Sequence, residues 1–187
     1  MSYFHPIPDE NKWTDVAGKW ITDCIFVIAL AFWLVYMFGQ QVVVVGNSMS
    51  PTLSDENTVL VNRMVYTLSE PERYDVVYIE TEEEDGSVTT MIKRIIGLPG
   101  ETVQITDGRI YIDGELLDFQ PDAESILNAG IADTPILLGR TEYFVIGDNW
   151  NNSQDSRVEE VGNIAAGEII GKVWLRTSPF KNIGLVE

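Results

Sequence analysis

The chain has one long apolar stretch near its start, and the rest is a succession of short segments in which apolar and polar residues alternate. The apolar stretch is free of charge from Cys24 to Phe38, over 15 residues. A helix needs about 20 apolar residues to cross a bilayer. Extending the stretch to residues 20–39 reaches that length and leaves Asp23 near the lipid headgroups. We therefore expect a single transmembrane helix over residues 20–39.

After this stretch the pattern becomes that of β-strands. Runs rich in Val, Ile, Thr and Tyr, bounded by Gly, Pro, Asn and Asp, are typical of strands. We expect strands at residues 41–45, 58–61, 75–80, 88–96, 102–106, 109–112, 143–146 and 168–176. Thr106-Asp107-Gly108, between two of them, is typical of a hairpin turn. Residues 115–140 lack the pattern and are predicted to be an irregular insertion. The predicted fold is an all-β domain, residues 40–187, preceded by one helix.

Charged residues around the apolar stretch predict its orientation. Lys12 and Lys19 precede it, and the next basic residue after it is Arg63. Because lysine and arginine gather on the cytoplasmic side of a membrane anchor, we expect residues 1–19 in the cytoplasm and the domain outside the cell membrane. A cleaved signal peptide is the alternative, but residues 37–39, Met-Phe-Gly, lack the small residues of a cleavage site.

The charge of the chain excludes one class of partner. The net charge is −17, and beyond residue 38 there are 25 acidic residues against 10 basic ones. Such a surface repels nucleic acid and has no attraction for anionic lipid headgroups. We expect no nucleic-acid partner, and we expect contact with membrane lipid through the anchor.

The chain has one cysteine, Cys24, and one histidine, His5. Cys24 has no partner for a disulfide, and zinc sites draw on Cys and His ligands that this chain lacks. We therefore expect no metal and no other cofactor. His5 precedes the anchor, so the predicted topology puts it on the opposite side of the membrane from the domain. A Ser-His-Asp arrangement is thereby excluded.

Two residues beyond the anchor predict hydrolytic chemistry that needs no histidine. Ser48 lies in G-N-S-M-S-P-T-L, and Lys93 lies in M-I-K-R-I-I-G-L-P-G-E. A serine hydroxyl needs a base to become a nucleophile, and a lysine can be that base only when desolvation lowers its pKa. Strand alternation puts Lys93 on one face with Met91 and Ile95, which favours a neutral amine. A lysine at a sheet edge that reaches water fits the same pattern.

The surroundings of Ser48 and a third polar stretch bear on this hypothesis. Gly46 permits a tight bend or the close approach of a substrate backbone, and the Ser48 amide is then a candidate oxyanion donor. The stretch G-D-N-W-N-N-S-Q-D-S-R, which ends at Arg157, predicts a tight hydrogen-bonded loop. In it Asp155 and Arg157 are candidates for an ion pair, and Ser153 for orienting an amine. The same composition is also that of an ordinary turn.

Taken in order, these stretches resemble the motifs of bacterial type I signal peptidases (leader peptidases). With Y-D-V-V-Y between the first two, the resemblance covers the chain apart from roughly residues 1–15 and 115–140. It implies a membrane-bound serine protease with a Ser-Lys dyad on an all-β fold, which removes signal peptides from exported preproteins. It also implies small residues at positions −1 and −3 of the cleavage site, with apolar neighbours of the nucleophile such as Met49 lining the pockets.

The resemblance implies a role for each matching residue. Ser48 is the nucleophile, and Lys93 is the general base that later protonates the leaving amine. Ser153 matches a serine that hydrogen-bonds the lysine. Asp155 and Arg157 match a structural ion pair.

Three positions depart from the family pattern. Gly46 stands where some members have a serine that donates to the oxyanion, which leaves the Ser48 amide as the main donor. Trp150 and Asn151 replace the Arg and Asp that usually follow Gly-Asp-Asn, so the charge contacts of that loop must differ. The resemblance leaves open a peptidase dedicated to a pilin or conjugation-factor precursor, or a non-catalytic scaffold. An intact Ser48 and Lys93 disfavour the scaffold.

Overall fold

The first unit of the structure is one long helix. The computed structural model describes residues 12–82, 85–119, 121 and 124–186, so the expectations for residues 1–11, including His5, lie outside the described residues. Helix α1 spans Lys12–Phe38, 27 residues, and its part Val16–Leu34 is long and apolar enough to cross a membrane. The helix starts before the predicted residue 20 because no proline interrupts the polar residues that precede the apolar stretch.

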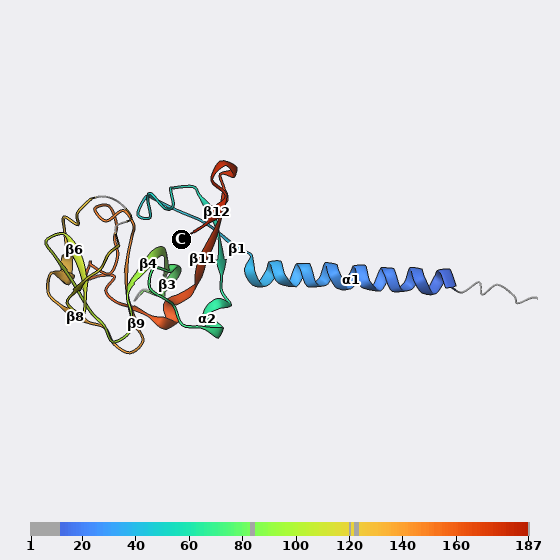
Figure 1. Cartoon of the computed structure of the whole chain (residues 1–187), viewed down its shortest axis with the longest axis horizontal. Helices are drawn as coiled ribbons and strands as arrows, with labels where there is room; N and C mark the ends of the chain where they lie inside the picture. Colours follow the sequence, from blue (N-terminus) through green and yellow to red (C-terminus); the bar gives the residue numbers. More distant parts are fainter. Residues whose placement is uncertain (1–11, 83–84, 120, 122–123, 187) are drawn as a thin grey trace, which may run out of the picture. The chain divides into compact units, whose positions relative to one another are not determined.

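The second unit, residues 38–187, is built mainly from antiparallel strands (Figure 1). The larger sheet has the order β1 (Gln40–Val43), β2 (Thr58–Asn62), β11 (Ile169–Ser178), β3 (Val76–Glu82), β4 (Val88–Gly97), β9 (Glu142–Ile146) and β10 (Ile164–Ala165), with β12 (Gly184–Leu185) paired to β11. Its central hairpin is β3–β4, in which Val77 pairs with Lys93. Both neighbours of Lys93 in the chain are therefore held in a continuous ladder.

A smaller sheet lies beside β9, at the end of the domain where Figure 1 labels β6 and β8. Its order is β7 (Glu115–Leu116), β6 (Arg109–Ile112), β5 (Thr102–Thr106) and β8 (Ile136–Leu137). The β5–β6 turn places Asp107 at φ 51° and Gly108 at φ 72°. Two consecutive positive φ values match the right-handed twist of a hairpin, which is why Asp-Gly is favoured here.

Four short helical segments complete the described part of the domain. They are α2 (Val65–Leu68) and the 3-10 turns η1 (Gly130–Asp133), η2 (Ala166–Glu168) and η3 (Phe180–Asn182).

Three clusters of buried apolar side chains form the core. One joins the two sheets: it contains Ile96, Phe144 and Ile146 from the larger sheet together with residues of the smaller one. The predicted insertion, residues 115–140, contributes to this cluster through buried side chains such as Ile126. The other two clusters cover the two faces of the β3–β4 hairpin. Of the two catalytic candidates, Lys93 lies on β4 of this hairpin and Ser48 lies in the connection between β1 and β2.

The predicted fold class, an all-β domain after a single N-terminal helix, is confirmed. The eight predicted strands are present, with ends that differ by at most two residues. The strands that sequence reasoning missed, β7, β8, β10 and β12, have two residues each. A two-residue strand forms because a partner strand lies beside it, and it is too short to show a periodic pattern in the sequence.

Candidate active site

The turn between β1 and β2 presents Ser48. The Ser50 amide donates to Asn47 O at 3.1 Å, which closes the turn around Ser48. Gly46 enters the turn at φ 82°, a conformation that favours glycine. Its N–H donates to Asp55 Oδ1 at 2.8 Å, so it is already engaged. The Ser48 N–H, by contrast, donates to no group within the described residues.

Lys93 reaches this turn from the middle of β4. Its Nζ lies 2.9 Å from Ser48 Oγ, although the two residues are 45 positions apart in the chain. The side chain is only 4% exposed. Burial lowers the pKa of Lys93 below its ordinary value, and the positive charge of Arg157 lowers it further. The carboxylates of Asp155 and Asp148 partly offset the lowering. Desolvation is the largest effect, so the site favours the neutral amine.

The loop after β9 carries a buried ion pair. Arg157 Nε and one terminal nitrogen each donate to an Asp155 carboxylate oxygen at 2.8 Å, with side-chain exposures of 5% and 0%. Asp155 Oδ2 also accepts the Gly147 N–H at 3.0 Å. A bidentate pair of this kind fixes the orientation of both the guanidinium group and the carboxylate group. It therefore holds the start and the end of the 147–157 loop in one arrangement.

Ser153 lies close to the turn around the candidate nucleophile Ser48 (residues 46–50, called here the nucleophile turn), but its hydroxyl is not bonded to Lys93. Its Oγ is buried and has no hydrogen-bond partner among the described residues, Lys93 included. It packs against Gly147, where an added Cβ would lie 2.2 Å from Ser153 Oγ and 2.4 Å from Ser48 O. Gly147 is therefore one point at which the 147–157 loop touches the nucleophile turn.

Sequence reasoning missed a second buried ion pair, Arg94 with Asp148. Arg94 Nε and one terminal nitrogen donate to the two Asp148 oxygens at 2.8 and 2.7 Å. The Arg94 guanidinium also lies 5.3 Å from the centre of the Phe119 ring. The signal was available, because an arginine inside a strand that is buried on both faces needs a carboxylate partner.

Asn149 was missed as well. Its backbone N–H donates to Ser48 O at 3.0 Å, and its side-chain amide donates to Asn47 O at 3.1 Å. Two consecutive carbonyls of the nucleophile turn are thus fixed by one residue of the 147–157 loop.

A shallow hollow of about 70 Å³ opens beside Ser48. Most of its lining residues are apolar, among them Met49, Met91 and residues 42–45 at the end of β1, and Ser48, Tyr78 and Thr90 add polar atoms. Met49 is almost fully buried and forms part of the wall without protruding. A hollow of this size holds a small side chain.

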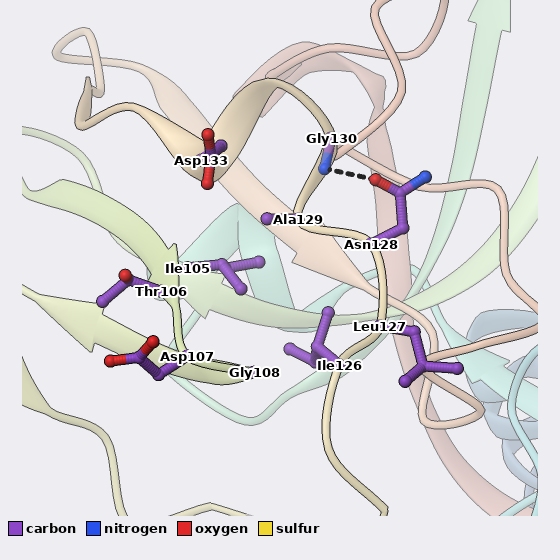
Figure 2. Close-up of a pocket in the computed structure, with 10 residues that line it drawn as sticks. All are labelled: Ile105, Thr106, Asp107, Gly108, Ile126, Leu127, Asn128, Ala129, Gly130 and Asp133. Atoms are coloured by element: carbon purple, nitrogen blue, oxygen red, sulfur yellow. Dashed lines mark hydrogen bonds between the residues drawn. The ribbon is translucent and has the colours of Figure 1, made fainter.

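A separate and larger hollow, about 380 Å³, lies in the smaller sheet. Figure 2 shows its lining, from the β5–β6 turn on one side and residues 126–130 on the other. It shares no lining residue with the hollow beside Ser48. Nor do the described residues contain any group of three His, Cys, Asp or Glu side chains placed to hold a metal ion.

Comparison with known proteins gives one family. The family model described as signal peptidase, peptidase S26, matches residues 17–177. The chain is 34% identical over 183 residues to signal peptidase I T of Bacillus subtilis (strain 168), covering 92% of this chain and 91% of that protein. It is 29% identical over 184 residues to the probable signal peptidase I-2 of a Synechocystis species, covering 96% and 79%. A solved structure of a signal peptidase I from Enterococcus faecalis V583 is 28% identical, with a TM-score of 0.43 over 56% of this chain and 97% of that one.

Proposed function

The chain belongs to the signal peptidase family, peptidase S26, and we propose that Ser48 and Lys93 are the two residues with which it cleaves signal peptides from preproteins. The removal of signal peptides is the activity of this serine protease family. The observation that carries the residue assignment is the distance of 2.9 Å between Lys93 Nζ and Ser48 Oγ. The burial of Lys93, which lowers the pKa of its amine, supports the same assignment.

The reaction begins with the neutral Lys93 amine. It takes the hydroxyl proton of Ser48 as Oγ attacks the carbonyl carbon of the scissile bond. The negative charge that develops on the carbonyl oxygen is stabilised by the Ser48 N–H, with Gly46 offering space but no donor of its own. The Lys93 ammonium then gives its proton to the leaving amine, which becomes the N-terminus of the mature protein.

The second half of the reaction releases the signal peptide. Its new C-terminal carbonyl is at this point an ester of Ser48. Lys93, neutral again, takes a proton from water, and the water oxygen attacks the ester. The bond to Ser48 Oγ breaks, the proton returns to that oxygen, and the signal peptide leaves as a carboxylic acid. One lysine thus serves both steps.

Residues of the 147–157 loop support the pair without reacting. Ser153 has a buried hydroxyl with no partner among the described residues, and rotation of that hydroxyl lets it accept a hydrogen bond from the Lys93 ammonium as it forms. The Asp155–Arg157 pair holds the loop, and Asp155 also favours the charge on Lys93 in the intermediate. Met49 and its apolar neighbours take the small side chains at positions −1 and −3.

The N-terminal apolar helix and the family indicate membrane anchoring. We propose that residues 20–39 span the bilayer, that residues 1–19 are cytoplasmic, and that residues 40–187 act outside, at the lipid surface. The lysines at positions 12 and 19 support this orientation because they precede the apolar stretch, whereas no basic residue follows it until Arg63.

The test is cleavage of a panel of preproteins by the full-length protein in detergent. We expect Ser48→Ala and Lys93→Ala to abolish cleavage, while Lys181→Ala, which removes an exposed lysine, leaves it unchanged. In the wild type, kcat/KM should rise with pH through a pKa below that of an ordinary lysine, because only the neutral amine is a base. Cleavage retained by Lys93→Ala would contradict the dyad. Cleavage of one preprotein alone would identify a dedicated peptidase, and cleavage of none would support the scaffold.

A further inference from the structure

Residues 124–131, in the connection between the two strands β7 and β8, contact the 147–157 loop at both of its flanks. These residues are far from Ser48 in the chain and contribute nothing to the hollow beside it. The contacts are nevertheless numerous and directional. They include the side chain of Asn151 and lie beside Trp150.

The first flank is held by the side chain of Asn151. Its Oδ1 accepts the Leu127 N–H at 2.9 Å. Its Nδ2 donates to Ser125 O and to Glu124 Oε2, both at 3.1 Å. One amide therefore satisfies a backbone donor, a backbone acceptor and a carboxylate. An aspartate at this position has no N–H and could serve only the first.

The second flank is held by Arg157. Its guanidinium donates to Asn128 O at 3.3 Å, and its carbonyl accepts the Ile131 N–H at 2.9 Å. Gly130 packs so closely that an added Cβ would lie 2.0 Å from Arg157 O. In Figure 2 the Asn128 side chain turns back to accept the Gly130 N–H, a bond of 3.0 Å. The segment is thus shaped locally to fit against Arg157.

Trp150 lies between the two flanks, where it lines a hollow of about 160 Å³ together with residues of both segments. It is 4% exposed and belongs to the core cluster that joins the two sheets. The loop is consequently fixed at positions 150, 151 and 157. Ser153 and Asp155 lie between these fixed positions. Asp155 accepts a hydrogen bond from the Gly147 N–H, and Gly147 in turn lies against Ser48 O.

We propose that residues 124–131 brace the catalytic loop, and that Asn151 and Glu124 act together as positioning residues for Ser153 and the Asp155–Arg157 pair. This inference rests on the proposed function, since it concerns the geometry of the same reaction. The Asn151 amide and the Glu124 carboxylate are complementary, because the amide Nδ2 donates to a carboxylate oxygen. With aspartate at 151, two carboxylates would face each other across the contact that the amide now fills.

The experiment compares four variants of the full-length protein in detergent: Asn151→Asp, Glu124→Gln, their combination, and Asn152→Asp. Asn152 is the exposed neighbour, and its side chain makes no hydrogen bond to any described residue, so Asn152→Asp adds the same charge one position away. The readouts are kcat, KM and the pH profile on one preprotein, expressed per folded molecule, with thermal unfolding measured alongside.

We expect Asn151→Asp to lower kcat about tenfold with little change in KM. Glu124→Gln should restore much of the loss, because a glutamine can donate to the new carboxylate. Asn152→Asp should stay within about twofold of the wild type. Glu124→Gln alone keeps an oxygen that can accept from Asn151 Nδ2, so its kcat should fall less than that of Asn151→Asp. A merely structural role would lower the folded fraction and leave kcat per folded molecule unchanged.

Three results would overturn the brace: a wild-type kcat in Asn151→Asp, an equal loss in Asn152→Asp, or no recovery in the combination. Failure of the proposed function looks different. In that case Ser48→Ala would still cleave, or the wild type would not cleave at all.

Discussion

A methyl group added at Gly147 would test how closely the 147–157 loop controls the nucleophile. An alanine Cβ at this position would lie 2.4 Å from Ser48 O, 2.2 Å from Ser153 Oγ and 2.7 Å from Ser153 Cβ. Ordinary van der Waals contact begins at 3.4 Å. The neighbours are a backbone carbonyl and a short side chain, so neither can swing away. Gly147→Ala must therefore move Ser48 and the loop apart by about 1 Å.

The expected loss of activity follows from that displacement. Misplacing a reacting group by about 1 Å costs about 100-fold in rate, so we expect kcat to fall by about two orders of magnitude. The domain itself should survive, because overpacking of one methyl group costs about 1–3 kcal/mol. For a domain of this size that corresponds to a fall in Tm of about 2–12 °C.

The assay is steady-state cleavage of one preprotein with kcat and KM determined separately, together with thermal unfolding. Gly167→Ala is the matched control, because nothing lies within 4 Å of an added Cβ there, and it should behave as the wild type. A kcat for Gly147→Ala within about threefold of the wild type would refute the argument that this contact positions Ser48.

Two further predictions concern the buried charges. Asp148→Ala should lower the free energy of unfolding by about 3–5 kcal/mol, because it removes the bidentate carboxylate partner of the buried Arg94 guanidinium. Urea titration measures this, and the double variant Arg94→Met/Asp148→Leu should lose less than Asp148→Ala alone. Lys93→Met should be inactive yet more stable than the wild type at neutral pH. The pKa of Lys93 is lowered in the fold from 10.5, so the unfolded chain binds that proton more tightly, and wild-type stability rises with pH between the lowered pKa and 10.5. The advantage of Lys93→Met should therefore shrink over this range, and a gap between the two proteins that does not change with pH would contradict the desolvation of Lys93.

Much of this protein follows from local pattern. The anchor follows from the absence of charge between Cys24 and Phe38, and the major strands follow from β-branched runs bounded by turn residues. The Asp107-Gly108 turn is equally local, because two positive φ values restrict which residues can occupy it. Ser48 and Lys93 were identified from motifs and from the lack of any histidine beyond the anchor. In each case the information lies within a few neighbouring residues.

The arrangement around those two residues depends on tertiary contacts. The strand pattern of Lys93 fits a buried base and an exposed edge lysine equally, and only the packing of β4 between β3 and β9 removes water from its amine. The Arg94–Asp148 pair, the Asn149 contacts with the nucleophile turn and the Asn151–Glu124 contact each join residues 27 to 102 positions apart. The sequence by itself thus determined the apolar helix and the strands, which depend on local residue preferences, and its motifs singled out Ser48 and Lys93 as the candidate pair. Only the folded domain decided the lowering of the Lys93 pKa and the contacts that hold the 147–157 loop, because desolvation and long-range hydrogen bonds exist only once the strands have packed together.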